Sequence, residues 1–291
     1  MIQARQKRSP AILAVSFGTT NGDSLRTEIE AVEQAVARRF PEYELRRAFA
    51  SQALIEQLKK TNNLQVDSIR EALEKAVEDR IALLAVQPTY FVNGYEYEAL
   101  EKMIREYEDR FERIVIGEPL LKSEEDYKAA AEAVAEKASA YDDGRTAVCF
   151  MGHGVRGRAD SHCGGRGTIK SAAVHSGDGV SEYVKVQQKL RKAGYTNCYI
   201  GTMQSGLSVE DLLKTIRCRE YRRIVLIPFM LTAGRHARRE MAGSQEDSWK
   251  SVFEREGYEV LCVIEGLGRL RGIQQIYAAH TEAALHKIFK E

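Results

Sequence analysis

The chain has 291 residues, with 43 Lys and Arg against 42 Asp and Glu, so its formal net charge is +1. This length suits about two domains, and 44% apolar residues with only five prolines exclude disordered and collagen-like classes. A chain so close to neutral lacks the excess of positive charge that general nucleic-acid binding requires.

Nothing in the sequence indicates a membrane or secreted protein. The apolar run after MIQARQKRSP is too short for the core of a signal peptide, and no stretch reaches the roughly 20 apolar residues that span a bilayer. The five cysteines contain no CxxC pair. We therefore expect a cytoplasmic, reduced protein.

Short apolar runs alternate with longer amphipathic stretches, which predicts βαβ units around parallel sheets. Strands are predicted at 11–17, 44–49, 81–86, 113–116, 147–151, 197–200, 223–227 and 259–264. Helices are predicted at 24–39, 66–78, 95–110, 124–140, 181–193, 208–217 and 273–289.

The two halves resemble each other. A proline and a glycine six residues apart recur in AVQPTYFVNGYEYE and LIPFMLTAGRHARRE, and aligning them puts Glu96 opposite His236. Aligning AILAVSFG with AVCFMGHG puts Phe17 opposite His153 and Gly18 opposite Gly154. A duplicated α/β domain leaves this kind of pattern.

The predicted fold class is therefore α/β, with two similar domains that each hold a mainly parallel sheet flanked by helices. The boundary is expected in the polar segment YDDGR, which gives domains at 1–143 and 144–291. The last helix is free to pack across onto the first domain. Ligands of such sheets bind beyond the carboxyl ends of the strands, so residues just past the strands are the candidates for function.

Three of these residues have metal or proton chemistry. His153 lies between two glycines, and His236 and Glu96 lie close to helix starts. Each has an ordinary alternative: a turn-capping histidine, an exposed histidine in a first helical turn, and a carboxylate that favours the helix dipole. Together across an interdomain crevice they would suit Co, Fe, Ni or Zn.

Basic residues gather near the same strand ends. Arg156 follows the GHG motif and Arg235 precedes His236. Guanidinium groups match carboxylates, so a polyanionic small ligand is one interpretation and solvated surface charge is the other. Residues 155–179 are rich in Gly, Arg, Ser and His and show no periodicity, which is typical of a lid or a disordered loop.

Several motifs in order along the chain resemble the anaerobic, CbiK-type sirohydrochlorin cobaltochelatases, which are class II chelatases. They are LAVSFGTT, NGYEYE, EPLL, MGHG, PFMLTAGRHA and EDSWK. The resemblance implies two α/β domains related by pseudo-twofold symmetry. It also implies insertion of Co2+ into sirohydrochlorin without ATP, on the anaerobic route to cobalamin.

The resemblance also implies roles for individual residues. His153 and Glu96 would be catalytic, and both would bind the metal together with His236 and Gln204. The residues expected to contact the substrate are Ser16, Phe17, Gly18, Thr19, Tyr90, Arg156 and Arg235. The expected partners are a tetrapyrrole and a divalent metal, with no cofactor beyond the metal substrate, and a homo-oligomer is left open.

Three residues depart from the family pattern. Gln204 stands where a glutamate is usual, Arg235 where an aspartate is common, and Tyr90 where a histidine is frequent. An amide oxygen can still bind a metal but brings no charge. Two alternatives therefore stay open: a chelatase for Fe2+, Ni2+ or a haem-type porphyrin, and a tetrapyrrole carrier without catalysis.

Overall fold

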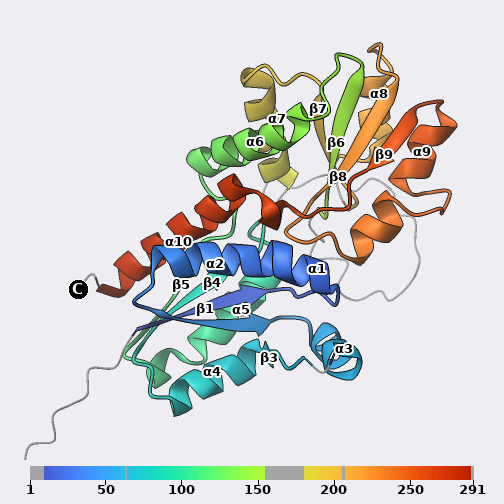
Figure 1. Ribbon diagram of the computed structural model, residues 1–291. Helices are drawn as coiled ribbons and strands as arrows, with labels where there is room; N and C mark the ends of the chain where they lie inside the picture. The colour runs from blue at the N-terminus through green and yellow to red at the C-terminus, as the bar shows by residue number, and fades with distance from the viewer. Residues whose placement is uncertain (1–9, 63, 155–179, 205–206, 290–291) are drawn as a thin grey trace, which may run out of the picture. The chain divides into compact units, whose positions relative to one another are not determined.

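The computed structural model describes residues 10–62, 64–154, 180–204 and 207–289 (Figure 1). The chain forms two compact units. The first unit comprises Met1–Tyr90, Glu96–Leu120 and Gln274–Glu291, and the second comprises Phe91–Tyr95 and Leu121–Ile273. No helix in the described ranges is both long and apolar enough to cross a membrane.

The first unit is built on a parallel sheet with strand order β3-β2-β1-β4-β5. Its strands are β1 (Ala11–Ser16), β2 (Glu44–Phe49), β3 (Asp67–Ser68), β4 (Leu83–Pro88) and β5 (Arg113–Ile116). The central strand β1 is buried along its whole length, as a parallel strand covered by helices on both faces should be.

The helices of the first unit cover both faces of its sheet (Figure 1). They are α1 (Gly22–Ser24), the π-helical turn η1 (Leu25–Ile29), α2 (Glu30–Arg39), α3 (Gln52–Asn62), α4 (Ile69–Glu78), α5 (Tyr95–Arg105), the 3-10 turn η2 (Glu108–Arg110) and α10 (Arg271–Phe289). Because side chains alternate along a strand, Ile12 packs with α2 and α10, whereas Leu13 packs with α4 and α5.

The second unit holds a parallel sheet with strand order β7-β6-β8-β9. Its strands are β6 (Thr146–Gly152), β7 (Cys198–Thr202), β8 (Arg223–Phe229) and β9 (Glu259–Cys262). Its helices and short turns are α6 (Glu124–Ser139), α7 (Val180–Lys192), α8 (Val209–Ile216), η4 (Ala237–Met241), α9 (Trp249–Arg255) and η5 (Leu267–Arg269). Helices α8 and α9 pack on one face of the sheet, and α6 and α7 pack against each other.

The two sheets have corresponding strand orders. In each unit the first strand lies centrally, with the second strand on one side and the next main strands on the other, and β3 is the one addition in the first unit. The turns after the two central strands are also alike, because Gly18 and Gly154 have positive φ angles of 105° and 79°. The predicted fold class is confirmed.

The elements also differ from the sequence predictions in three places. The elements β3, α3 and α9 were not predicted. Strand β3 has only two residues and α9 only seven, and α3 places only Ile55 and Leu58 in the core, so none of the three gives a clear periodic signal. The compact units are discontinuous in the sequence, with α6 in the second unit and most of α10 in the first. A boundary between residues 143 and 144 stays a proposal for where the repeats meet.

Candidate functional site

His153 follows the buried strand β6 and is held by close contacts on both sides. A Cβ atom on Gly152 would lie 2.5 Å from the Tyr183 ring, and one on Gly154 would lie 1.9 Å from the carbonyl oxygen of Gln204. Only glycine fits at these two positions without a shift of the neighbouring groups. The imidazole is therefore presented at the carboxyl end of the strand in a defined turn.

Gln204 lies in the turn that follows β7, directly beside the turn that carries His153. The backbone N–H of Met203 donates to the carbonyl oxygen of Gly152 at 3.0 Å, and that of Gln204 donates to the carbonyl oxygen of His153 at 3.2 Å. The side-chain Oε1 of Gln204 is shielded from solvent and has no hydrogen-bond partner among the described residues. A buried carbonyl oxygen without a donor is costly, and a bound cation would satisfy it.

His236 comes close to His153. The two ring centroids are 4.9 Å apart and the rings are nearly perpendicular, at 76°. The parallel pairing of β6 with β8 explains this proximity. Gly152 lies opposite Phe229, so the segments that follow the two strands leave the sheet at the same edge. The structure thus brings together the two predicted histidines and Gln204 within the second unit.

The two predicted arginines have different outcomes. Arg235 is exposed beside His236, where a guanidinium is accessible to a ligand. Arg156 lies outside the described residues, as does the whole loop at 155–179.

In the first unit, the turn after β1 presents an aromatic ring to solvent. Phe17 is 55% exposed, whereas Ser16 and Thr19 are buried on either side of it. The Ser16 hydroxyl shares a hydrogen bond of 2.9 Å with that of Thr89. Gly18 packs its backbone on the Phe49 ring, where a Cβ atom would lie at 2.8 Å. An exposed aromatic at a strand end suits a flat apolar ligand.

Tyr90 and Glu96 follow the carboxyl end of strand β4 in the first unit. Burial raises the pKa of the Tyr90 hydroxyl well above its ordinary value, and the charge of Glu96 raises this pKa further. The hydroxyl is therefore protonated at neutral pH and is available as a hydrogen-bond donor. Glu96 is exposed in the first turn of α5. Its approach to the histidines stays a prediction.

No three side chains of His, Cys, Asp or Glu in the described part of the chain gather closely enough to hold a metal ion together. Two further residues lie near the motifs. Tyr95 is 67% exposed beside Glu96, and Glu240 lies one helical turn after His236, within 3.3 Å of its ring. The spacing of four residues between His236 and Glu240 was the signal available in the sequence.

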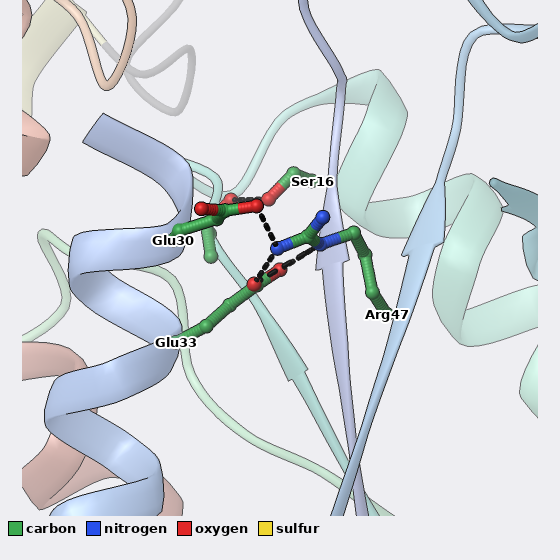
Figure 2. Close-up of polar contacts among 5 residues, drawn as sticks. Ser16, Glu30, Glu33 and Arg47 are labelled. Carbon is green, nitrogen blue, oxygen red and sulfur yellow. Dashed lines mark hydrogen bonds and ion pairs between the residues drawn. The ribbon is translucent and has the colours of Figure 1, made fainter. Parts of the chain in front are cut away.

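A buried ionic group lies outside this set of residues. Figure 2 shows the guanidinium of Arg47, on β2, between the carboxylates of Glu30 and Glu33 on α2. Arg47 Nε donates to Glu33 Oε1 at 2.8 Å. Burial raises the pKa of Glu33 above its ordinary value, although the hydrogen bond and charge of Arg47 oppose this rise. The ionic group of Arg47, Glu30 and Glu33 therefore connects helix α2 to strand β2.

The α/β fold with two parallel sheets is shared with solved structures of other proteins. The structure resembles SirB from Bacillus subtilis with Fe3+, with a TM-score of 0.60, 13% identity and coverage of 95% of both chains. It also resembles CbiX, described as the terminal enzyme for biosynthesis of siroheme in denitrifying bacteria, with a TM-score of 0.55, 14% identity and coverage of 94% of this chain and 98% of the other. These likenesses show the fold.

The family follows from the sequence comparison. Residues 10–164 and 171–286 match the model of the family described as Cobalt chelatase (CbiK), and the chain belongs to this family. A sirohydrochlorin cobaltochelatase from Salmonella typhimurium is 28% identical over 97% of this chain and 98% of its own length. Sirohydrochlorin cobaltochelatase CbiKC from Nitratidesulfovibrio vulgaris is 28% identical over 94% of this chain and 90% of its own. The protein is a metal chelatase.

Proposed function

We propose that the protein inserts Co2+ into sirohydrochlorin without ATP, in the anaerobic synthesis of cobalamin. Membership of the cobalt chelatase family and two relatives named for this reaction support the proposal. The observation that carries it is the pair of imidazoles, His153 and His236, brought to 4.9 Å at the ends of two strands. The location proposed for the reaction is the cytoplasm.

The donor set in the second unit fits a borderline divalent ion. Imidazole nitrogens suit Co2+, Ni2+ and Fe2+ alike, so the ligand types by themselves leave the metal open. In this proposal His153 and His236 bind Co2+, and the unpartnered Oε1 of Gln204 supplies a neutral oxygen ligand. Glu96 is proposed as the carboxylate of the site on the strength of its motif, NGYEYE.

Metal insertion exchanges one divalent ion for two protons. As Co2+ forms bonds to the four ring nitrogens, two pyrrole N–H bonds break and their protons pass to bases near the ring. His153 and Glu96 are the proposed acceptors, since imidazole and carboxylate both accept protons near neutral pH. The charge of the metal lowers the proton affinity of the groups around it and so favours release of the two pyrrole protons.

The remaining residues are proposed to hold the tetrapyrrole. Phe17 offers an exposed aromatic ring, and the protonated hydroxyl of Tyr90 offers a hydrogen-bond donor. Backbone groups of the turn at Ser16, Gly18 and Thr19 would line the ring edge. Arg235, and Arg156 from its place in the sequence, are proposed partners for the carboxylates of sirohydrochlorin.

The test is anaerobic incubation of the purified protein with sirohydrochlorin and Co2+, followed by absorbance, without ATP. His153→Ala is expected to lower the rate by at least about 100-fold, since a lost proton acceptor typically costs that much. His286→Ala, which removes an exposed histidine on α10, is the control and should keep the wild-type rate. Parallel assays with Fe2+ and Ni2+ identify the preferred metal.

Wild-type turnover in a folded His153→Ala protein would reject the proposed role of this residue. Tight binding of sirohydrochlorin with no insertion of any of the three metals would reject the chelatase reaction itself.

A further inference from the structure

Glu240 is a charged residue that the proposed chemistry does not use. It lies one helical turn after His236, and the π-helical turn η4 (Ala237–Met241) carries it. Ala237 and Met241, which directly follow His236 and Glu240, are both fully buried. Burial of Ala237 and Met241 fixes how the turn is rotated about its axis, so that His236 and Glu240 lie next to each other at the border of the core.

The two side chains approach each other through one pair of atoms. Nδ1 of His236 lies 3.3 Å from Oε2 of Glu240. Both atoms are shielded from solvent, and neither has an aligned hydrogen bond to any described residue. The His236 side chain is nevertheless 43% exposed, so its exposed area belongs to the other atoms of the ring.

The charge of Glu240 has no second partner in the described ranges. No lysine or arginine there lies within ion-pair distance of its carboxylate, although Arg238 and Arg239 lie in the same turn. Both of these arginines are exposed. The carboxylate therefore faces the imidazole rather than the neighbouring cations.

We infer that Glu240 is a positioning residue, whose carboxylate holds the Nδ1–H of His236 and leaves Nε2 as the nitrogen that binds the incoming metal ion. A histidine that binds a metal usually donates its other N–H to a carboxylate or carbonyl, which fixes the tautomer and the orientation of the ring. Orientation matters here because His153 and His236 stand edge to face at 76°. The inference rests on the proposed function, in which His236 binds Co2+.

The ordinary alternative is a helix pair of opposite charge without any function. Lys250 and Glu254 on α9 are such a pair in the same unit, with an N–O distance of 3.7 Å and side chains that are 39% and 48% exposed. Pairs of this kind contribute little to stability. Glu254→Gln is therefore the matched control for Glu240→Gln.

The experiment uses Co2+ alone as the metal probe, titrated into purified protein under anaerobic conditions and followed by calorimetry and visible absorption. Glu240→Gln is expected to weaken Co2+ binding by about 10- to 100-fold, the usual effect of losing the partner of a metal-binding histidine. Glu240→Asp, which keeps the charge, should recover part of the affinity. Glu254→Gln should bind Co2+ like the wild type.

A second measurement reads the tautomer without any metal. In 15N spectra of histidine-labelled protein, neutral His236 should carry its proton on Nδ1 in the wild type and populate both tautomers in Glu240→Gln. A wild-type proton on Nε2 would overturn the inference, whatever the stability of the variants.

His236→Ala separates this inference from the proposed function. Weaker Co2+ binding in His236→Ala, together with unchanged affinity and tautomer in Glu240→Gln, would overturn the role of Glu240 and leave the metal site standing. Unchanged Co2+ binding in His236→Ala would overturn both.

Discussion

The glycine after His153 shows how closely the turns at the strand ends are fitted. Gly154 has a φ of 79°, and a Cβ atom there would lie 1.9 Å from the carbonyl oxygen of Gln204. This contact keeps the turn after β6 against the turn after β7. The position of a proposed metal ligand, Gln204, therefore depends on the absence of a side chain at Gly154 in the neighbouring turn.

A left-handed conformation costs a non-glycine residue about 1–2 kcal/mol. Gly154→Ala is expected to lower the free energy of unfolding by more than this amount, because the added Cβ atom also clashes with the carbonyl oxygen of Gln204. It should also weaken Co2+ binding. Gly144→Ala is the matched control, since Gly144 has a similar φ of 74° but open space around it. Urea unfolding and Co2+ titration measure both effects, and equal losses in the two variants would show that the contact with Gln204 is unimportant.

At the same scale, some of the proposed site residues are easier to recognise in the sequence than others. His153 and His236 are recognisable because each lies near glycines just past a strand. The packing of Gln204 on the His153 turn depends on hydrogen bonds between segments about fifty residues apart, which no local pattern reveals. Glu240 was missed because an acid four residues after a histidine in a charged helix is usually a surface pair.

Among the elements, helix α2 and strand β2 are joined by the ionic group of Arg47, Glu30 and Glu33 (Figure 2). The Glu33 side chain is only 8% exposed, and that of Arg47 is 26% exposed. A buried carboxylate is costly without its cation, so removing Arg47 alone should cost more stability than the intact ionic group contributes.

Arg47→Met is expected to lower the free energy of unfolding by about 3 kcal/mol at neutral pH, since it leaves Glu33 buried and unpaired. The pKa of Glu33 is already raised above 4.5 in the folded protein and should rise further in the variant. A raised carboxyl pKa favours folding below the unfolded value and loses this contribution as pH rises through the folded value. The destabilisation should therefore be small near pH 4.5 and grow toward neutrality.

Urea unfolding at a series of pH values measures this dependence. The double variant Arg47→Met with Glu33→Gln should recover much of the lost stability and show little of the added pH dependence. A loss that is the same at every pH would mean that the effect comes from packing rather than from the unpaired charge.

The main strands and the longer helices were predictable because their apolar residues are regularly spaced and bounded by polar turns. Buried strands such as β1 and β8 and capped helices such as α6 are local features: Ser123 and Asp126 form a capping box at the start of α6. The short elements β3 and α9 are defined by what they pack against, so their sequences carry little signal of their own.

Across the whole chain, the placement of α10 departs most from a linear division into two halves. Residues from Gln274 onward belong to the first unit. Leu285 and Ile288 pack with Ile12 and Val36 in its core, and the Tyr277 hydroxyl donates to the carbonyl oxygen of Thr89 at 2.9 Å. The sequence left this placement open, because the apolar pattern of a helix does not say which sheet will cover it.

Removing residues 274–291 is expected to unfold the first unit and spare the second. The loss includes Ile276, Leu285 and Ile288, which at about 2 kcal/mol each approach the whole stability of a typical domain. Hydrogen exchange should show lost protection in β1 and β4 and retained protection in β6 and β8. Phe289→Ala, at an exposed position, is the control, and retained protection in β1 after the truncation would contradict this account.

The position of α10 also sets an order of events while the polypeptide is being made. The strands β1 to β5 emerge first from the ribosome, but the helix that closes their core emerges only after every residue of the second unit. Domains generally fold as units during synthesis. Here the earlier-made sheet must wait with the part of its apolar face that α10 covers still exposed, so the later-made unit is free to reach its native state before it.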